Sequence, residues 1–321
     1  MTRDVLGDGF EALPLRLSAL PARKGPGVED VATLVRYRTQ RPTRGAMLYL
    51  HGYNDYFFQR HVAEHFSASG YDFYALDLRG YGRSLRDGQI PNYVADLRYH
   101  FEELDLAARI LREDHGHGRL TVIGHSTGGL IATMWAHERR DDAVLDALVL
   151  NSPWLELARG WFMRTVGTAT IRALGLARAP AVVVRYGLEN VYGMSVHRGH
   201  HGEWDYDLRW KPISGFPIRA GWIGSVRRHH ARLHAGLAVA VPVLVLHSTK
   251  SLLNSKLWSA DAMSADTVLD VRQIARWAPR IGPQVSVVGV EGGMHDLFLS
   301  AEPVRARVLA EIDKWLADVP S

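Results

Sequence analysis

A six-residue turn signal, Gly-His-Ser-Thr-Gly-Gly at residues 124–129, stands between a short apolar run, Leu120–Ile123, and a helical pattern, Leu130–Arg139. Glycines lie two positions before and two positions after Ser126, where side chains would collide with the neighbouring strand and helix of a tight strand–turn–helix. Such a turn strains the serine backbone and leaves the hydroxyl at the carboxyl end of a sheet, beside the free N–H groups of a helix N-terminus. We therefore predict that Ser126 is a nucleophile, although a glycine-rich turn without any chemistry would read the same way.

Short apolar runs alternate with helical patterns before and after this turn, which is typical of βαβ units in a mostly parallel sheet. The strands are expected at Val31–Arg38, Ala46–Leu50, Phe73–Leu76, Leu120–Ile123, Ala147–Leu150, Val241–Leu246 and Val285–Val290. The helices are expected at Phe58–Ser69, Asn92–Arg112, Leu130–Arg139 and Thr267–Arg280, and in a terminal segment with Pro303 in its first turn and Val304, Val308, Ile312 and Trp315 as its buried stripe. The pattern predicts an α/β fold with a mostly parallel central sheet flanked by helices.

The alternation stops after Pro153 and resumes near residue 238. The intervening residues 154–237 contain five of the nine tryptophans and six of the 16 histidines, with glycine-rich stretches. We interpret residues 1–153 and 238–321 as one divided core domain, and residues 154–237 as an insertion into it.

The composition narrows the chemistry and the partners. No cysteine is present, which excludes disulfide frameworks, thiolate metal sites and a cysteine nucleophile. Basic residues are spread along the chain at a formal net charge of +4, a pattern that argues against a nucleic-acid partner. The longest apolar stretch, Ala235–Leu246, is shorter than the roughly 20 residues that span a bilayer, and residues 1–15 lack a secretory signal pattern. We expect a cytoplasmic protein, and the oligomeric state stays open.

A serine nucleophile needs a base, and the base needs an orienting carboxylate. His295 follows the last expected strand on a loop at the same sheet edge as Ser126, which predicts that it is the general base. Asp266 stands just before the expected helix Thr267–Arg280 and is the favoured carboxylate, although an ordinary helix N-cap would explain it equally well. Asp261 is the competing candidate.

A third aspartate in this region, Asp270, fits the second half of a capping box that starts at Thr267, which indicates a structural role. The oxyanion of an acyl-transfer reaction needs two N–H donors. We predict the backbone N–H groups of Thr127, in the nucleophile turn, and of Tyr53, where Gly52 lets the chain bend after a strand. A plain strand-ending turn is the alternative interpretation of this loop.

Four motifs together are similar to those of one family. They are His51-Gly52, Asp77–Ser84 (Asp-Leu-Arg-Gly-Tyr-Gly-Arg-Ser), Gly124–Gly129 and Gly293-Met294-His295. This set resembles the α/β-hydrolase fold, and within it the branch of monoacylglycerol lipases, lysophospholipases and serine aminopeptidases. The resemblance covers nearly the whole chain outside residues 154–237. It implies a serine esterase with a cap inserted between the sixth and seventh strands, in which Asp77–Ser84 is a structural turn beside the site.

The chain departs from this family after the expected strand Val241–Leu246. Ser248–Ala265 replaces the short glycine-aspartate turn that is usual there, which leaves the choice between Asp266 and Asp261 open.

Aromatic residues near the oxyanion loop and in the insertion suggest an apolar pocket, with Tyr56, Phe57 and Trp161 as candidate substrate-binding residues. Such a pocket favours a lipophilic acyl ester as the small-molecule substrate, as in monoacylglycerol- or lysophospholipid-like esters. The apolar stripe in Trp161–Leu174 would allow at most transient contact with a membrane surface.

Two alternatives stay open. The first is an aminopeptidase, for which the acidic residues Glu203, Asp205 and Asp207 of the insertion could hold a substrate ammonium group. The second is a non-catalytic ligand-binding protein with the same fold. No cofactor or metal is expected: His230 and His234 have a zinc-compatible spacing, but Ala231 stands where a metalloprotease motif has glutamate.

Overall fold

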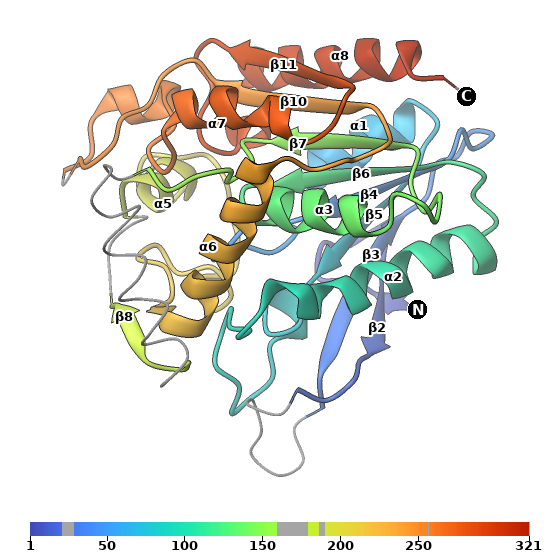
Figure 1. The fold of residues 1–321 in the computed structure, drawn as a ribbon, viewed down its shortest axis with the longest axis horizontal. Helices are drawn as coiled ribbons and strands as arrows, with labels where there is room; N and C mark the ends of the chain where they lie inside the picture. Colours follow the sequence, from blue (N-terminus) through green and yellow to red (C-terminus); the bar gives the residue numbers. More distant parts are fainter. Residues whose placement is uncertain (21–28, 159–178, 186–189, 256, 321) are drawn as a thin grey trace.

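A nine-stranded sheet organises the protein, with the strand order β1-β2-β3-β5-β4-β6-β7-β10-β11 (Figure 1). The computed structural model describes residues 1–20, 29–158, 179–185, 190–255 and 257–320. The strands of this sheet are β1 (Thr2–Arg3), β2 (Phe10–Arg16), β3 (Val31–Tyr37), β4 (Ala46–Leu50), β5 (Asp72–Asp77), β6 (Leu120–His125), β7 (Ala147–Asn151), β10 (Val243–Ser248) and β11 (Val285–Val290). Strands β5, β4, β6, β7, β10 and β11 pair in parallel, and β1, β2 and β3 add an antiparallel edge. The predicted mostly parallel sheet is confirmed.

Helices cover both faces of the sheet. The described helices are α1 (Arg60–Ala68), α2 (Phe101–Arg109), α3 (Thr127–Glu138), α5 (Asn190–Val196), α6 (Ala220–Ala235), α7 (Val271–Trp277) and α8 (Glu302–Asp318), of which α5 and α6 belong to the segment between β7 and β10. On one face, Phe66 of α1 and Ile312 of α8 belong to a cluster with Tyr49 of β4. On the other face, side chains of α2, α3, α6 and α7 pack against alternate residues of the same strands. The central strands β4 and β7 are buried at every residue because helices cover them on both sides.

The chain leaves the sheet after β7 and returns at β10, its parallel neighbour. The residues between these strands, 152–242, are called the excursion here. Its described elements include α5, α6 and a two-stranded antiparallel sheet of β8 (Val182–Val184) and β9 (Ile218–Arg219). In Figure 1 these elements lie to the left of the main sheet, near the start of α3.

Four helices start at other residues than predicted: α1 begins at Arg60 instead of Phe58, and α3 begins at Thr127 instead of Leu130. The expected helix Asn92–Arg112 begins at Leu97 as a 3₁₀ turn, because Asn92 adopts a left-handed φ of 54° and the Asp96 side chain caps the turn by accepting the N–H of Arg98. The expected helix Thr267–Arg280 begins only at Val271 in α7. The terminal helix α8 is as predicted, with Pro303 in its first turn.

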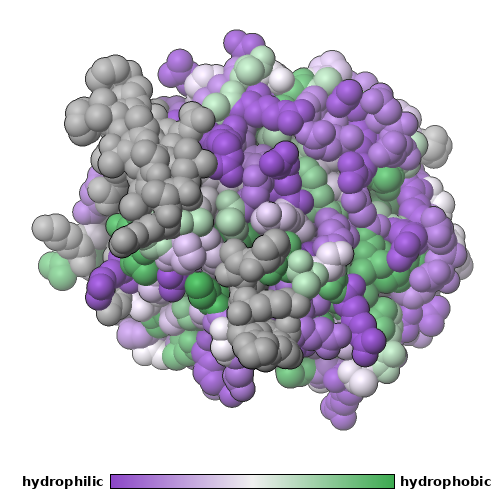
Figure 2. All heavy atoms as spheres, turned by 60° about the horizontal axis from the view of Figure 1, so that its bottom comes forward, coloured by the Kyte–Doolittle hydropathy of each residue, from purple (hydrophilic) through white to green (hydrophobic). Residues whose placement is uncertain are grey.

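The outer surface is largely polar on the face drawn in Figure 2, where hydrophilic side chains surround smaller hydrophobic areas. Among the described residues, no helix has the length and apolar composition that a membrane crossing requires.

Candidate active site

The turn between β6 and α3 holds Ser126 in a strained conformation, with φ 52° and ψ −118°. The Ser126 N–H donates to the Asn151 carbonyl at 3.0 Å, and the Trp154 N–H donates to the Ser126 carbonyl at 3.0 Å. Both partners lie at the end of β7 and the beginning of the excursion. The neighbouring strand therefore fixes the turn.

The glycines on both sides of Ser126 are required by close backbone contacts. A Cβ on Gly124 would lie 2.7 Å from Cα of Gly129, and a Cβ on Gly128 would lie 2.2 Å from the carbonyl oxygen of His51. Real Cβ atoms essentially never approach so closely. The packing of α3 against β6 and the end of β4 therefore requires glycine at both positions, as predicted from the sequence.

Three side chains predicted from the sequence meet at the carboxyl edge of the sheet. His295 Nε2 lies 3.0 Å from Ser126 Oγ, and His295 Nδ1 lies 2.9 Å from Asp266 Oδ2. All three residues are buried, and Asp266 is fully inaccessible to solvent. Such a chain can remove a proton from the serine hydroxyl and stabilise the imidazolium that forms.

The loop after β10 explains how Asp266 reaches His295. Asp266 pairs with Ser251 in an isolated β-bridge, and its Oδ1 accepts the N–H groups of Val268 at 2.8 Å and Leu269 at 2.7 Å. The interpretation of Asp266 as the N-cap of the following helix is wrong, since that helix starts at Val271. Asp261, the competing candidate, is exposed.

Asp270 takes the capping position instead. Its side chain accepts the N–H of Arg272 at 3.2 Å, as an N-cap residue of α7 does. The predicted role as the second half of a capping box at Thr267 is therefore wrong, although the residue is structural as expected.

The loop after β4 lies against Ser126. A Cβ on Gly52 would lie 3.0 Å from Ser126 Cβ, so only glycine fits at this distance without displacing the serine. Tyr53 follows, and its hydroxyl donates to the carbonyls of Phe216 and Pro217 in the excursion. Thr127 is the first residue of α3, where a helix leaves backbone N–H groups without intrahelical partners. The oxyanion role of the Tyr53 and Thr127 N–H groups stays a prediction.

The three predicted substrate-binding residues lie in different surroundings. Tyr56 is buried in a cluster with Tyr192 and Met294, and its hydroxyl accepts the N–H of Asp207 at 2.8 Å. Phe57 is fully buried and packs in the core under α1, and its substrate-binding role stays a prediction. Trp161 lies outside the described residues.

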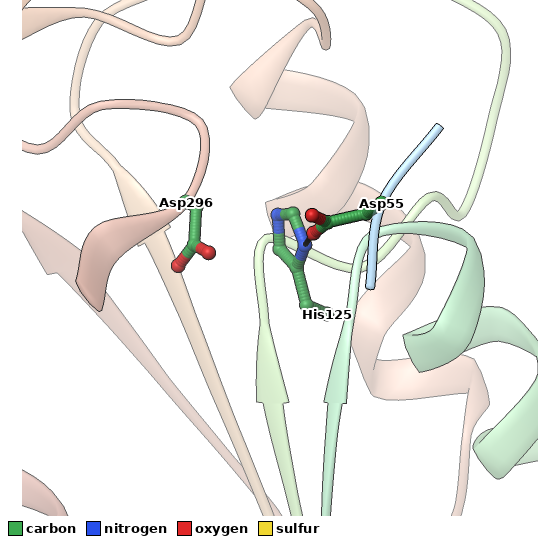
Figure 3. Close-up of side chains that lie close together, drawn as sticks. All are labelled: Asp55, His125 and Asp296. Atoms are coloured by element: carbon green, nitrogen blue, oxygen red, sulfur yellow. Dashed lines mark ion pairs between the residues drawn. The ribbon is translucent and has the colours of Figure 1, made fainter. Parts of the chain in front are cut away.

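A second cluster of buried polar side chains lies beside Ser126 and was not predicted. Figure 3 shows the His125 imidazole next to the Asp55 carboxylate, with Asp296 on its other side. Donor atoms of these three residues lie within 4.8 Å of one another, as in a metal site. However, Lys211 Nζ lies 3.0 Å from Asp55 Oδ1. A divalent cation would have to displace this ammonium group, so an ion-paired network explains the cluster better than a metal centre does.

Both carboxylate oxygens of Asp296 also accept hydrogen bonds. Its Oδ1 accepts from the Asn151 side chain at 2.7 Å and from the Phe298 N–H at 3.0 Å, while its Oδ2 accepts from Gln59 at 3.1 Å. These bonds fix the residue that follows His295. The bonds from Asn151 and Gln59 are not visible as a sequence pattern, because these two partners lie 145 and 237 residues from Asp296 in the chain.

Burial and charge shift the pKa values of this cluster. Burial alone would raise the pKa of the Asp55 carboxyl, but the Lys211 ammonium and the His125 imidazole outweigh it and lower this pKa to about 2. Burial disfavours the charged form of His125, yet the carboxylates of Asp296 and Asp55 raise its pKa above the ordinary value. The cluster is therefore a set of charges that depend on one another.

The histidine pair with zinc-compatible spacing on α6 has main-chain partners. His230 Nε2 lies 2.8 Å from the Trp154 carbonyl, and His234 Nε2 lies 2.9 Å from the Leu155 carbonyl. These contacts tie α6 to the beginning of the excursion.

Comparison with known proteins assigns the family. The sequence profile of the family described as serine aminopeptidase, S33, matches residues 41–302. The monoacylglycerol lipase of Mycolicibacterium smegmatis (strain ATCC 700084 / mc(2)155) is 27% identical over 294 residues, which cover 85% of this chain and 88% of that protein.

Solved structures share the fold. A soluble variant of monoglyceride lipase from Saccharomyces cerevisiae, in complex with a substrate analog, superposes with a TM-score of 0.68 at 18% identity and covers 93% of this chain and 95% of its own. Monoacylglycerol lipase from Paleococcus ferrophilus gives a TM-score of 0.66 at 20% identity, with 89% of this chain and 99% of its own covered. With the profile match over most of its length, the chain belongs to the serine aminopeptidase S33 family and has the α/β-hydrolase fold.

Proposed function

We propose that the protein hydrolyses carboxylic esters through a Ser126–His295–Asp266 triad and an acyl-enzyme. The observation that carries this proposal is the continuous chain of contacts from Asp266 through His295 to Ser126 at the carboxyl edge of the sheet. Ser126 Oγ attacks the ester carbonyl while His295 takes the hydroxyl proton. His295 then protonates the leaving alcohol, and water attacks the acyl-enzyme by the same route in reverse.

The tetrahedral oxyanion is assigned to the backbone N–H groups of Tyr53 and Thr127. Two observations support this assignment: Gly52 brings the loop after β4 against Ser126, and Thr127 starts α3. Donors held in place before the reaction stabilise the developing charge without reorganisation.

We further propose that residues 154–237 form a cap over the site and that the acyl group is lipophilic. Tyr192 of α5 packs edge-on against the His295 ring, with centroids 5.4 Å apart. Around it, Tyr56, Phe58 and Met294 form an aromatic and apolar cluster next to the reacting groups. The similarity to monoacylglycerol lipases favours a monoacylglycerol- or lysophospholipid-like substrate.

An aminopeptidase is the second candidate, because the family is named for that activity. It would need free acidic groups to hold the substrate ammonium. However, Glu203 pairs with Arg305, Asp205 pairs with Arg198 at 2.9 Å, and Asp207 pairs with Arg209 at 2.5 Å. Because arginines already occupy the three carboxylates considered for this role, the structure favours the esterase.

The first test is hydrolysis of p-nitrophenyl acyl esters by wild type and Ser126→Ala. We expect the variant to lose at least about 10⁴-fold in kcat while retaining its circular dichroism spectrum, because the nucleophile is removed without a change in packing. A fluorophosphonate probe should label wild type and leave Ser126→Ala unlabelled. Full turnover by the variant would refute the assignment of the nucleophile.

A substrate panel separates the two candidate activities. Esters of increasing acyl length, monoacylglycerols and aminoacyl anilides are compared by kcat/KM on the same preparation. We expect cleavage of the esters, with a preference for medium or longer acyl chains. Anilide cleavage that exceeds ester cleavage would instead favour the aminopeptidase.

A further inference from the structure

Lys211 is a buried lysine of the excursion, only 3% exposed. Its Nζ lies 3.0 Å from Asp55 Oδ1 and donates to the Asn54 carbonyl at 3.3 Å. The rings of Tyr192 and Tyr206 lie 5.4 and 5.7 Å from the same nitrogen. An ammonium group is buried in this way only where a partner charge offsets its lost hydration, which here is the Asp55 carboxylate.

Asp55 in turn faces the residue that precedes the nucleophile. Asp55 Oδ2 lies 3.6 Å from His125 Nδ1, and His125 is the last residue of β6. The His125 ring centroid lies 5.0 Å from that of His295. Contacts therefore run from Lys211 of the excursion through Asp55 to His125. His125 in turn precedes Ser126 in the chain and lies beside the His295 ring.

The geometry points to Lys211 and Asp55 as positioning residues that hold His125, and through it Ser126 and His295, in reactive alignment. This inference rests on the proposed esterase function and extends it from the reacting groups to their support. Lys211 acts through its charge as well as through packing. Without its ammonium group, the buried Asp55 carboxylate would lose its partner at 3.0 Å and would keep His125 at 3.6 Å. The excursion thereby helps to complete the catalytic centre.

The charged groups that face His125 come from three segments besides its own strand. They are Asp55 on the loop after β4, Lys211 on the excursion, and Asp296 with His295 on the loop after β11. The two carboxylates raise the pKa of His125, and the Lys211 ammonium lowers it. Removal of Lys211 should therefore raise this pKa further, whereas removal of the Asp55 charge should lower it.

The test compares Lys211→Met, Asp55→Asn, the double variant and Lys211→Arg. Ester turnover is normalised to the active sites that a fluorophosphonate probe titrates, so that misfolded protein is not counted. We expect kcat of Lys211→Met to fall by about 10²-fold with a smaller change in KM, since small misplacements of catalytic groups cost rate on this scale. Lys211→Arg should retain most of the rate, because it keeps the charge.

The double variant distinguishes charge from packing. Replacement of both members of a buried ion pair by neutral groups is often tolerated, whereas loss of one member leaves the other charge buried without a partner. We expect Asp55→Asn/Lys211→Met to lose less kcat than Lys211→Met, because the amide keeps the shape of the Asp55 side chain beside His125 and no buried charge is left unpaired. Lys314→Met, which changes an exposed lysine of α8, should be unaffected. If Lys211→Met does not fold, the comparison of Asp55→Asn with the double variant carries the test.

A nuclear magnetic resonance titration of the His125 Cε1–H signal, assigned by its loss in His125→Gln, gives a readout that does not need activity. The midpoint should rise in Lys211→Met and fall in Asp55→Asn. An unmoved midpoint, an unchanged kcat in folded Lys211→Met, or an equally deep loss in the double variant would each overturn the inference. If wild type hydrolyses no ester, the proposed function fails, while the titration still reports on the contacts.

Discussion

Asp266 has two carboxylate oxygens with separate tasks. One accepts two backbone N–H groups of its own loop, which fixes the side chain, and the other faces His295 Nδ1. The loop thus orients the carboxylate before any substrate binds. A neutral amide at this position would keep the shape of the site but could no longer stabilise the imidazolium.

We therefore expect Asp266→Asn to lower kcat by about 10⁴-fold, the loss typical when the triad carboxylate becomes an amide. Asp261→Asn is the matched control, because Asp261 is an exposed aspartate of the same loop. Both are measured with the same p-nitrophenyl ester. A comparable loss in Asp261→Asn would exclude the proposed division of roles.

The three residues of the proposed triad could be predicted from the sequence to different degrees. Ser126 and His295 could be placed because each lies on the turn or loop after a strand, and the carboxyl ends of parallel strands share one edge. Asp266 stayed in competition with Asp261, since the long loop after β10 has no periodic pattern to fix its path. Lys211 could not be found, because its burial results from packing between segments more than 150 residues apart.

Helix α7 shows how a single side chain determines where an element begins. Asp270 accepts the N–H of Arg272, and the helix starts at Val271 instead of Thr267. Residues 267–270 therefore stay in the loop, where the N–H groups of Val268 and Leu269 hold the Asp266 carboxylate.

Loss of this N-cap should destabilise the protein. We expect Asp270→Ala to lower the free energy of unfolding by about 1 kcal/mol, the usual cost of removing an N-cap side chain. Urea unfolding followed by circular dichroism measures the change. Asp261→Ala, in an exposed turn, should stay within about 0.5 kcal/mol of wild type. Equal stability of the two variants would mean that the cap contributes nothing.

Elements with unbroken apolar runs were predicted closely, and elements that depend on tertiary contacts were not. Strand β4 has the expected bounds, Ala46–Leu50, because each of its residues is buried. Strand β2 was missed, since Pro14 interrupts its run and argues against a strand. It forms because it pairs along its length with β3.

Burial lowers the pKa of several histidines in the molecule. Burial lowers the pKa of His230 well below its ordinary value, and that of His51 and His229 in the same direction. Below about pH 6.5 the unfolded chain therefore binds more protons at these positions than the folded chain does. The unfolded state is then favoured as the pH falls.

We therefore expect the free energy of unfolding to decrease from pH 7 to pH 5, by up to about 1.4 kcal/mol per pH unit for each histidine that stays neutral. The raised pKa of His125 acts in the opposite direction, and the contribution of Asp55 is lost only as the pH falls from about 4 toward about 2. Urea unfolding at several pH values measures the slope. His230→Gln should give a shallower slope, and an identical slope would remove His230 from the explanation.

The parallel pairing of β7 with β10 has a consequence for synthesis of the chain. The pairing partner of Leu148, Val243, is made only after the whole excursion has been synthesised. Until then one edge of a fully buried, apolar strand lacks its neighbour, and such edges recruit other strands. The same chain order that places the excursion beside the nucleophile thus makes folding depend on a late, long-range contact, which is slow for topological reasons.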